Sequence, residues 1–299
     1  MSGRKARERP RRYDPVAVPR LMENSPDPTD AHPPREIARR VERLGVAKAH
    51  TSAVSLFVLA LLAGAFISLG ALFFIVVVTK SGLGFGVTRL LGGMSFSLGL
   101  ILVVVAGAEL FTGNNLLAMA WASRLINTRQ VLRNWILVYL GNVLGCLGTV
   151  LFVLWADVGR LGEGAVGETA LQIATTKAGL SFGVVFARGV LCNSLVCLAV
   201  WLAMGGRSVA DKILAILPPI TAFVTLGFEH SIANWFFLPF GMALETEGAI
   251  PFLGVAGNLV AATLGNLVGG TLLVAGVYWV AYLRGEKKGD RSGEIGDGR

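Results

Sequence analysis

The chain has 299 residues, of which 54% are hydrophobic and only 15% are charged, and its formal net charge is +8. A soluble domain carries about 25% charged residues, so this composition excludes an ordinary soluble protein and favours a membrane protein with several spans. The positive charges collect at the ends of long apolar stretches, where they set orientation. No nucleic-acid-binding motif accompanies them, which argues against a nucleic-acid partner.

The N-terminal segment is basic and rich in proline. Residues 1–50 hold 12 of the 27 Lys and Arg residues, and residues 1–35 hold seven of the eleven prolines. We predict a disordered basic tail here. A short amphipathic helix over residues 36–48 then follows and lies along the membrane surface, because Ile37, Val41 and Leu44 recur at helical spacing.

Six apolar stretches come next, each long enough to cross about 30 Å of hydrocarbon. We predict all-α architecture, with transmembrane helices over residues 51–79, 94–123, 131–156, 180–204, 213–241 and 252–283. The chain then divides into a basic segment, 1–50, a transmembrane domain, 51–284, and a cytoplasmic tail, 285–299.

The loop charges predict how these spans are oriented. Of the Lys and Arg residues, 22 lie in residues 1–50, 124–133, 207–212 and 284–299, whereas the loops 80–93, 157–178 and 242–251 hold 4. Positive loops stay in the cytoplasm, so we expect a multi-pass protein of the inner membrane with both termini cytoplasmic. The remaining cation, Arg188, lies inside the fourth span. Its neighbours predict a structural partner, a carbonyl or an acid at a subunit contact.

Two segments echo each other across the chain. GAELFTGN (107–114) in the second span and GFEHSIAN (227–234) in the fifth share Gly, Glu and Asn at the same offsets, and LGN recurs at 140–142 and 264–266. Two similar halves of three spans each must enter the membrane from opposite sides. We therefore predict an inverted repeat of three plus three helices, with the second and fifth helices interrupted at these glycine-containing segments.

Ionisable residues at such breaks are candidates for function. Glu109 and Glu229 occupy matching positions, and we expect both to brace the breaks by accepting hydrogen bonds from freed backbone N–H groups. His230 has no counterpart, since Leu110 stands at its position in the first half. It is the only histidine of the membrane region, so a pore-lining role is favoured over a packing role.

At this point the sequence resembles the formate/nitrite transporter family. The motifs that carry the resemblance lie in all six spans: AGAFISLGALF (63–73), FSLGLILVVVAGAELFTGN (96–114), NWILVYLGNVLG (134–145), RGVLCNSLVCLAVWLA (188–203), GRS with DK (206–212) and GFEHSIANWFFLPFG (227–241). The family has an aquaporin-like fold, forms homopentamers with one pore per subunit, and moves small monovalent anions or their acids. The long basic N-terminal tail and the short loop before the last span depart from its pattern.

The resemblance assigns roles to individual residues. It implies pore contacts to substrate by Thr112, Asn193 and the central His230, with Lys177 attracting anions at the outer mouth. It also implies apolar constrictions formed by Phe96, Leu100, Leu110, Phe111, Val196 and Phe223. These constrictions would strip water from the anion, and the polar residues would replace it.

The resemblance implies a lipid-embedded homopentamer whose substrate is a small anion. Formate is favoured, with nitrite, hydrosulfide or another weak acid as the alternative. Proton-coupled passage through His230 is a hypothesis, and channel and symporter stay open. No cofactor or metal is expected. A membrane enzyme built on Glu109, Glu229 and His230 is disfavoured because no HExxH motif occurs, and a neutral-solute channel because no Asn-Pro-Ala box occurs.

Overall fold

The computed structural model describes residues 30–245, 248 and 250–285. Within these residues every regular element is a helix. The elements in chain order are α2 (Pro34–His50), α3 (Ala53–Val78), α4 (Phe85–Phe96), α5 (Leu98–Ala106), α6 (Phe111–Asn114), α7 (Leu117–Ala122), α8 (Thr128–Trp155), η1 (Val158–Arg160), α9 (Ala165–Ala178), α10 (Phe182–Gly205), α11 (Val209–Thr225), α12 (Ser231–Leu244), α13 (Phe252–Val268), η2 (Gly269–Gly276) and η3 (Trp279–Leu283). The predicted disordered tail lies mostly outside the described residues.

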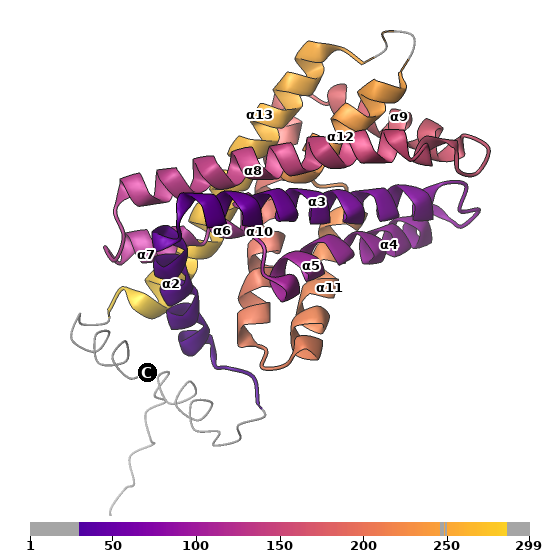
Figure 1. The fold of residues 1–299 in the computed structure, drawn as a ribbon. Helices are drawn as coiled ribbons and strands as arrows, with labels where there is room; N and C mark the ends of the chain where they lie inside the picture. The colour runs from indigo at the N-terminus through magenta and orange to yellow at the C-terminus, as the bar shows by residue number, and fades with distance from the viewer. Residues whose placement is uncertain (1–29, 246–247, 249, 286–299) are drawn as a thin grey trace, which may run out of the picture.

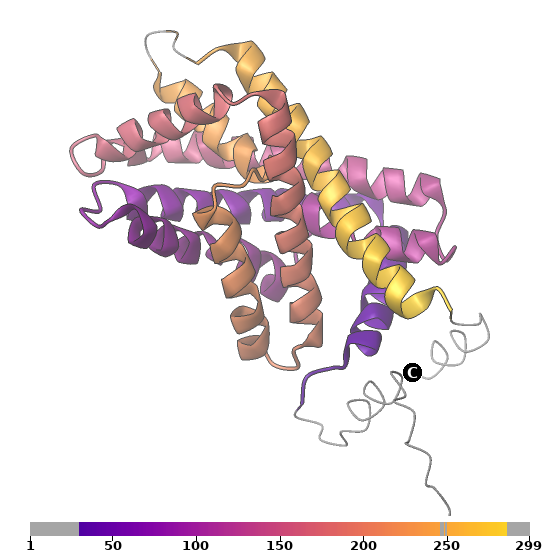
Figure 2. The same ribbon diagram turned by 180° about the vertical axis from the view of Figure 1, so that it is seen from behind.

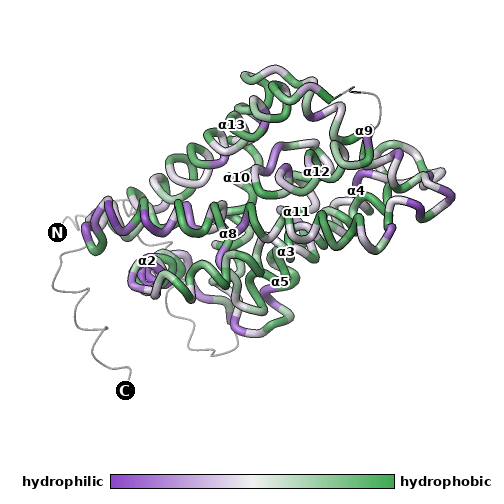
Figure 3. The backbone as a smooth tube through the Cα atoms, turned by 45° about the horizontal axis from the view of Figure 1, so that its top comes forward, coloured by the Kyte–Doolittle hydropathy of each residue, from purple (hydrophilic) through white to green (hydrophobic). Residues whose placement is uncertain are grey.

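Five helical stretches are long and apolar enough to cross a membrane. They are Ala53–Val78, Phe85–Ala106, Thr128–Trp155, Phe182–Gly205 and Phe252–Leu283. Hydrophobic residues dominate these helices, whereas hydrophilic residues recur along α2 (Figure 3). The fifth predicted span, 213–241, is not one helix, because α11 ends at Thr225 and α12 begins at Ser231.

The second span begins earlier than predicted. We placed its start near Met94, but α4 begins at Phe85, directly after Gly84. The stretch 85–93 contains an arginine and three glycines, which lowered its apparent hydrophobicity, yet Arg89 bonds to backbone carbonyls of α11 and so satisfies its charge there. The opposite loop 157–178 also contains structure that the sequence analysis left out, namely η1 and α9.

Two helix pairs form the framework. In Figure 1 α3 runs beside α8, and in Figure 2 α13 crosses α10. Both pairs approach closely at glycines. A Cβ atom at Gly145 of α8 would lie 2.1 Å from the carbonyl oxygen of Leu61, and one at Gly265 of α13 would lie 2.3 Å from that of Phe186. Only glycine permits such contacts, because both distances are far inside the van der Waals distance.

Non-helical backbone separates α5 from α6 and α11 from α12. After Ala106 the chain turns through Gly107, with φ of 84°, and after Thr225 it turns through Gly227, with φ of 71°. Glycine adopts this left-handed conformation without a Cβ penalty. Leu110 and His230 then precede the helices α6 and α12 in extended conformation.

The amphipathic helix predicted over 36–48 is α2, which extends from Pro34 to His50. Its apolar residues Ile37 and Val41 are buried in a cluster with Trp201 and Leu283. Lys48, in its last turn, reaches the segment between α5 and α6. The helix therefore contacts the interrupted region directly, and its position along a membrane surface stays a prediction.

Candidate transport site

Two cavities enter the helical assembly. One, of about 240 Å³, is lined by Leu100, Leu110 and Met204, among others. The second, of about 660 Å³, is lined by Phe96, Phe223 and His230, among others. The larger cavity is lined by Arg188, near the start of α10, and the smaller cavity by Met204, near its end. The two cavities therefore lie toward opposite ends of this helix.

Buried rings close the inner end of the larger cavity. The rings of Phe96 and Phe223 meet edge to face, with their centroids 5.6 Å apart. Phe223 stacks on the imidazole of His230 at 5.9 Å with an interplanar angle of 19°. Each of the three residues is at most 3% exposed. The structure thus brings the three predicted residues together in one buried, mostly apolar layer.

Hydrogen bonds determine the tautomer of His230. Its Nδ1 accepts from the backbone N–H of Ala233 at 3.1 Å and caps the start of α12. An imidazole nitrogen that accepts a hydrogen bond carries no proton, so in the neutral ring the proton lies on Nε2. Nε2 is 3.1 Å from Oγ1 of Thr112. The neutral histidine therefore donates to the threonine hydroxyl at the centre of the molecule.

Leu100 and Leu110 line the smaller cavity and are each 2% exposed. Val196 is also buried but lines neither cavity. Phe111 is directed elsewhere, since its ring packs edge to face on Tyr139 at 5.0 Å. The structure thus gathers four of the six predicted apolar constriction residues at the cavities and leaves Val196 and Phe111 behind them.

Asn193 is fully buried and also lines neither cavity. Its Nδ2 donates to the backbone carbonyls of Thr112 and Asn266, at 3.3 and 2.7 Å. Its Oδ1 has no hydrogen-bond partner among the described residues. In this structure Asn193 therefore holds α6 against α13, directly behind Thr112, and its contact with substrate stays a prediction.

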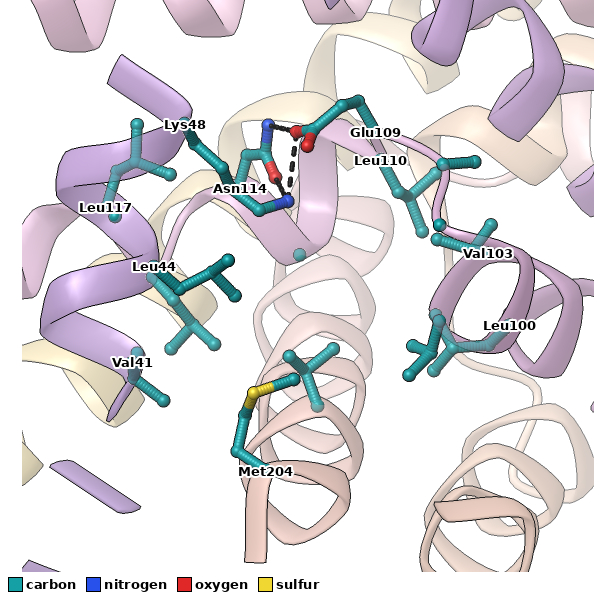
Figure 4. Close-up of a pocket in the computed structure, with 17 residues that line it drawn as sticks. Val41, Leu44, Lys48, Leu100, Val103, Glu109, Leu110, Asn114, Leu117 and Met204 are labelled. Atoms are coloured by element: carbon teal, nitrogen blue, oxygen red, sulfur yellow. Dashed lines mark hydrogen bonds and ion pairs between the residues drawn. The ribbon is translucent and has the colours of Figure 1, made fainter. Parts of the chain in front are cut away.

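The chain is non-helical between α5 and α6 and between α11 and α12, and we call these two stretches the interrupted segments. Beside each of them lies a cluster of Lys, Glu and two Asn residues. In the first, Lys48 donates to Glu109 at 2.9 Å and to Asn114 at 2.8 Å, and Asn114 donates to Glu109 (Figure 4). Asn114 also donates to Asn134. The carboxylate is thus paired with a cation and hydrogen-bonded by an amide, as a buried charge requires.

The second cluster repeats this arrangement. Lys177 donates to both oxygens of Glu229 at 3.0 Å. Asn234 donates to Glu229 and to Asn258, each at 2.7 Å, and Asn258 donates to the carbonyl of Lys177 at 3.0 Å. Lys48 lies in α2, before α3, whereas Lys177 lies in α9, between α8 and α10. The two lysines therefore come from helices at different places in the chain order.

Two further asparagines hold the backbone at the breaks. Asn142 accepts from the N–H of Phe111 and donates to the carbonyls of Ala60 and Glu109. Asn266 accepts from the N–H of Ser231 and donates to the carbonyls of Gly189 and Glu229. Freed backbone groups are therefore satisfied by these amides, as buried polar groups must be.

One detail of the sequence analysis is wrong. We expected the carboxylates of Glu109 and Glu229 to accept from the freed backbone N–H groups. Instead they accept from lysine and asparagine side chains. Asn142 and Asn266 can satisfy both the N–H and the C=O groups of the backbone, because a carboxamide donates and accepts at once, whereas a carboxylate only accepts.

Sequence reasoning missed Lys48 and the asparagine positions 114, 134, 234 and 258 as parts of the site. Asn142 and Asn266 belong to the LGN repeat, and Asn134 and Asn258 stand eight residues before them at the same 124-residue offset. That offset was a usable signal. Lys48 offered none, because a lysine at the end of an amphipathic helix is typical of a solvated face.

No group of three or more His, Cys, Asp and Glu side chains with metal-binding geometry occurs in residues 30–245, 248 and 250–285.

Comparison with known proteins agrees with the resemblance seen in the motifs. The model of the formate/nitrite transporter family matches residues 35–280. Formate channel FocA of Escherichia coli (strain K12) is 40% identical over 276 residues, which cover 86% of this chain and 97% of FocA. The uncharacterized transporter YrhG of Bacillus subtilis (strain 168) is 41% identical over 261 residues, covering 87% and 95%.

Solved structures are similar as well. A structure described as a pentameric formate channel with formate bound superposes with a TM-score of 0.72 at 39% identity, covering 78% of this chain and 98% of that one. An ion channel of the same family superposes with a TM-score of 0.76 at 29% identity, covering 82% and 98%.

Proposed function

Because the chain belongs to the formate/nitrite transporter family, we propose that it is a membrane channel for small monovalent anions, with formate as its main substrate. The observation that carries the proposal is the buried His230–Thr112 pair between two cavities. Formate is favoured over nitrite by the similarity to FocA and to a formate-bound channel. Nitrite, hydrosulfide and other weak-acid anions are the alternatives within the family.

The proposed path crosses two apolar layers. Phe96 and Phe223 form the layer below the larger cavity, and Leu100 and Leu110 form the layer below the smaller one. A hydrated cation that entered would lose its water without gaining acceptors. A carboxylate gains donors from His230 and Thr112 instead. For Phe111 and Val196 we propose a supporting role behind the path, and for Asn193 the positioning of Thr112.

We propose that six spans form an inverted repeat of three plus three, with α4–α5–α6–α7 and α11–α12 as the two interrupted helices. The support is the shared pattern of the two clusters and the two backbone-binding asparagines. Similarity to a pentameric channel supports a homopentamer. Loop charges support an inner-membrane location with both termini cytoplasmic, and the domain limits 1–50, 51–284 and 285–299 stand as proposed.

We further propose that passage is coupled to a proton. A proton from the water of the entry cavity reaches formate while the Nε2–H group of His230 holds the anion; formic acid crosses the apolar layers and releases the proton in the far cavity, so one proton moves with each formate and His230 ends as it began. The support is the Nε2–H group, which is directed at the hydroxyl of Thr112. A neutral acid avoids most of the desolvation cost that an anion incurs between apolar walls.

Uptake into proteoliposomes tests both the substrate assignment and the proton coupling. Initial rates of formate and nitrite uptake are measured for the wild type and for His230→Asn, with internal pH read at the same time. We expect faster formate uptake with internal acidification, and loss of both in the variant. Faster nitrite than formate uptake contradicts the substrate assignment. Formate current without a pH change contradicts proton coupling and leaves His230 as a hydrogen-bond donor.

A further inference from the structure

The two cavities differ in charge. Within the described residues, the charged side chains of the smaller cavity are Lys48 and Glu109, which pair at 2.9 Å and cancel. The larger cavity is lined by four cations and one carboxylate: Lys80, Arg89, Lys177 and Arg188 against Glu229. Because Lys177 is bound to both oxygens of Glu229, the other three cations give this wall an excess of positive charge.

Arg89 is rigidly placed. Its Nε donates to the carbonyl of Thr225 at 3.3 Å, and its guanidinium also donates to the carbonyl of Val224. The guanidinium lies 5.7 Å over the ring of Phe74. Arg89 thus satisfies the last carbonyls of α11 and keeps further donors for the cavity, since a guanidinium has five.

Arg188 lies in the second turn of α10 and is half-buried. Its backbone carbonyl accepts from the N–H of Glu229 at 3.5 Å. For its guanidinium, no hydrogen bond or ion pair is formed with any described residue, so the predicted structural partner is not found in this part of the chain. Arg188 and Arg89 line the same cavity. Two like charges on one wall are unfavourable unless an anion lies between them or near both.

We propose that Arg188, supported by Arg89, forms an anion-binding site in the larger cavity that receives small oxyanions before the Phe96–Phe223 layer. A guanidinium binds an oxyanion through two parallel N–H groups, a geometry that lysine lacks. The site rests on the proposed channel function, in which it concentrates formate at the pore entrance.

Divalent oxyanions are expected to bind at this site without passing through the channel. Sulfate has twice the charge of formate and four acceptor oxygens, so it binds two arginines more tightly. Its two charges make the apolar layers far more costly to cross. Sulfate therefore occupies the site without passing and blocks formate from this side. The smaller cavity, whose single cation is paired, offers no equivalent site.

The test is formate uptake by right-side-out and inside-out membrane vesicles that contain the full-length protein, with sulfate added outside. Arg188→Leu removes the site and Arg188→Lys keeps the charge without the guanidinium. The matched control is Arg160→Leu, which makes the same charge change at an exposed arginine that pairs with Asp157 and does not line the cavity.

We expect sulfate to inhibit in one vesicle orientation only. Arg188→Leu raises the sulfate concentration for half-inhibition by roughly tenfold, Arg188→Lys raises it by about threefold, and Arg160→Leu leaves it unchanged. Equal inhibition in both orientations, or unchanged inhibition of Arg188→Leu, overturns the proposal. If Arg188→Leu does not accumulate, Arg188→Lys alone decides, because unchanged inhibition in that variant overturns it equally.

Failure of the channel function is distinguishable from failure of this site. A wild type that carries no formate contradicts the channel. Sulfate binding to detergent-purified protein, measured by calorimetry, still tests the site in that case. Binding by the wild type and the control but not by Arg188→Leu supports it, and equal binding by all three overturns it.

Discussion

His230 has two nitrogen atoms with two different tasks. Nδ1 accepts from Ala233 and caps α12, which keeps the ring orientation constant. Nε2 is left to bond Thr112 across the centre of the molecule. A histidine whose ring was free to flip would present the wrong nitrogen half of the time. The start of α12 therefore positions the imidazole and also selects the nitrogen that faces Thr112.

Thr112→Val tests this contact, because valine has the same shape without the hydroxyl. In the proposed path the carboxylate accepts from the hydroxyl of Thr112, and valine removes this donor at a cost of about 1–3 kcal/mol. We expect the initial rate of formate uptake to fall by roughly tenfold, measured in proteoliposomes and normalised to the amount of protein inserted.

Thr112→Ser is the matched control. Serine keeps the hydroxyl and loses only a methyl group, so most of the wild-type rate should remain. If valine transports as fast as serine, the hydroxyl of Thr112 has no part in the path, and the contact with His230 is only structural.

The sequence revealed the residues that differ between the halves or repeat across them. His230 was visible because Leu110 stands at the matching position, and Glu109 and Glu229 because they repeat. The partners of the two carboxylates were not visible. Lys48 precedes the first span, and its contact with Glu109 depends on how α2 folds back on the membrane domain, which no local pattern specifies.

At the scale of elements, the close approach of α3 to α8 depends on glycine. Gly145 faces the carbonyl of Leu61 so closely that a methyl group there has no room. Gly148, on the same helix, has no atom of another described element within 4 Å of the position where its Cβ would be. Substitution by alanine adds the same methyl group at both places, so the two positions separate contact from helix propensity.

We expect Gly145→Ala to destabilise the protein by about 1–3 kcal/mol, because the helices must move apart or bend. Gly148→Ala should be neutral or slightly stabilising, by up to about 1 kcal/mol, since alanine favours helix. Thermal unfolding in detergent, followed by size-exclusion chromatography, measures both. Equal midpoints for the two variants would show that the helix pair tolerates separation.

The element boundaries show where sequence reasoning succeeds and where it does not. Apolar length located five of the spans, because hydrocarbon thickness sets the minimum length of a helix that crosses it. The start of α4 was missed because Arg89 looked like a loop residue. Its charge is satisfied by carbonyls at the end of α11, a contact 136 residues away in the chain.

At the scale of the whole molecule, the same polar network occurs twice. Lys48, Glu109 and Asn114 form one cluster, and Lys177, Glu229 and Asn234 form the other. The first lysine comes from α2 and the second from α9. Each interrupted segment is thus held by a helix outside its own span, and the fold around the central histidine depends on both.

Removing either lysine leaves a buried carboxylate without its cation. We expect Lys177→Met to destabilise the protein by roughly 3–5 kcal/mol. Lys48→Met should cost less, because the side chain of Glu109 is 11% exposed whereas that of Glu229 is 3% exposed. Thermal midpoints of the purified protein in detergent rank the two variants.

The second substitution identifies the cause. Glu229→Gln in the Lys177→Met background removes the unpaired charge but keeps an acceptor for Asn234, so it should recover most of the lost stability, and Glu109→Gln should do the same for Lys48→Met. If the double variants are as unstable as the single ones, the lysines act through their contacts with backbone and asparagine. Neutralisation of the carboxylates by the lysines of α2 and α9 then contributes little to stability. Recovery in both halves would instead mean that one electrostatic arrangement, used twice, holds both interrupted segments around His230.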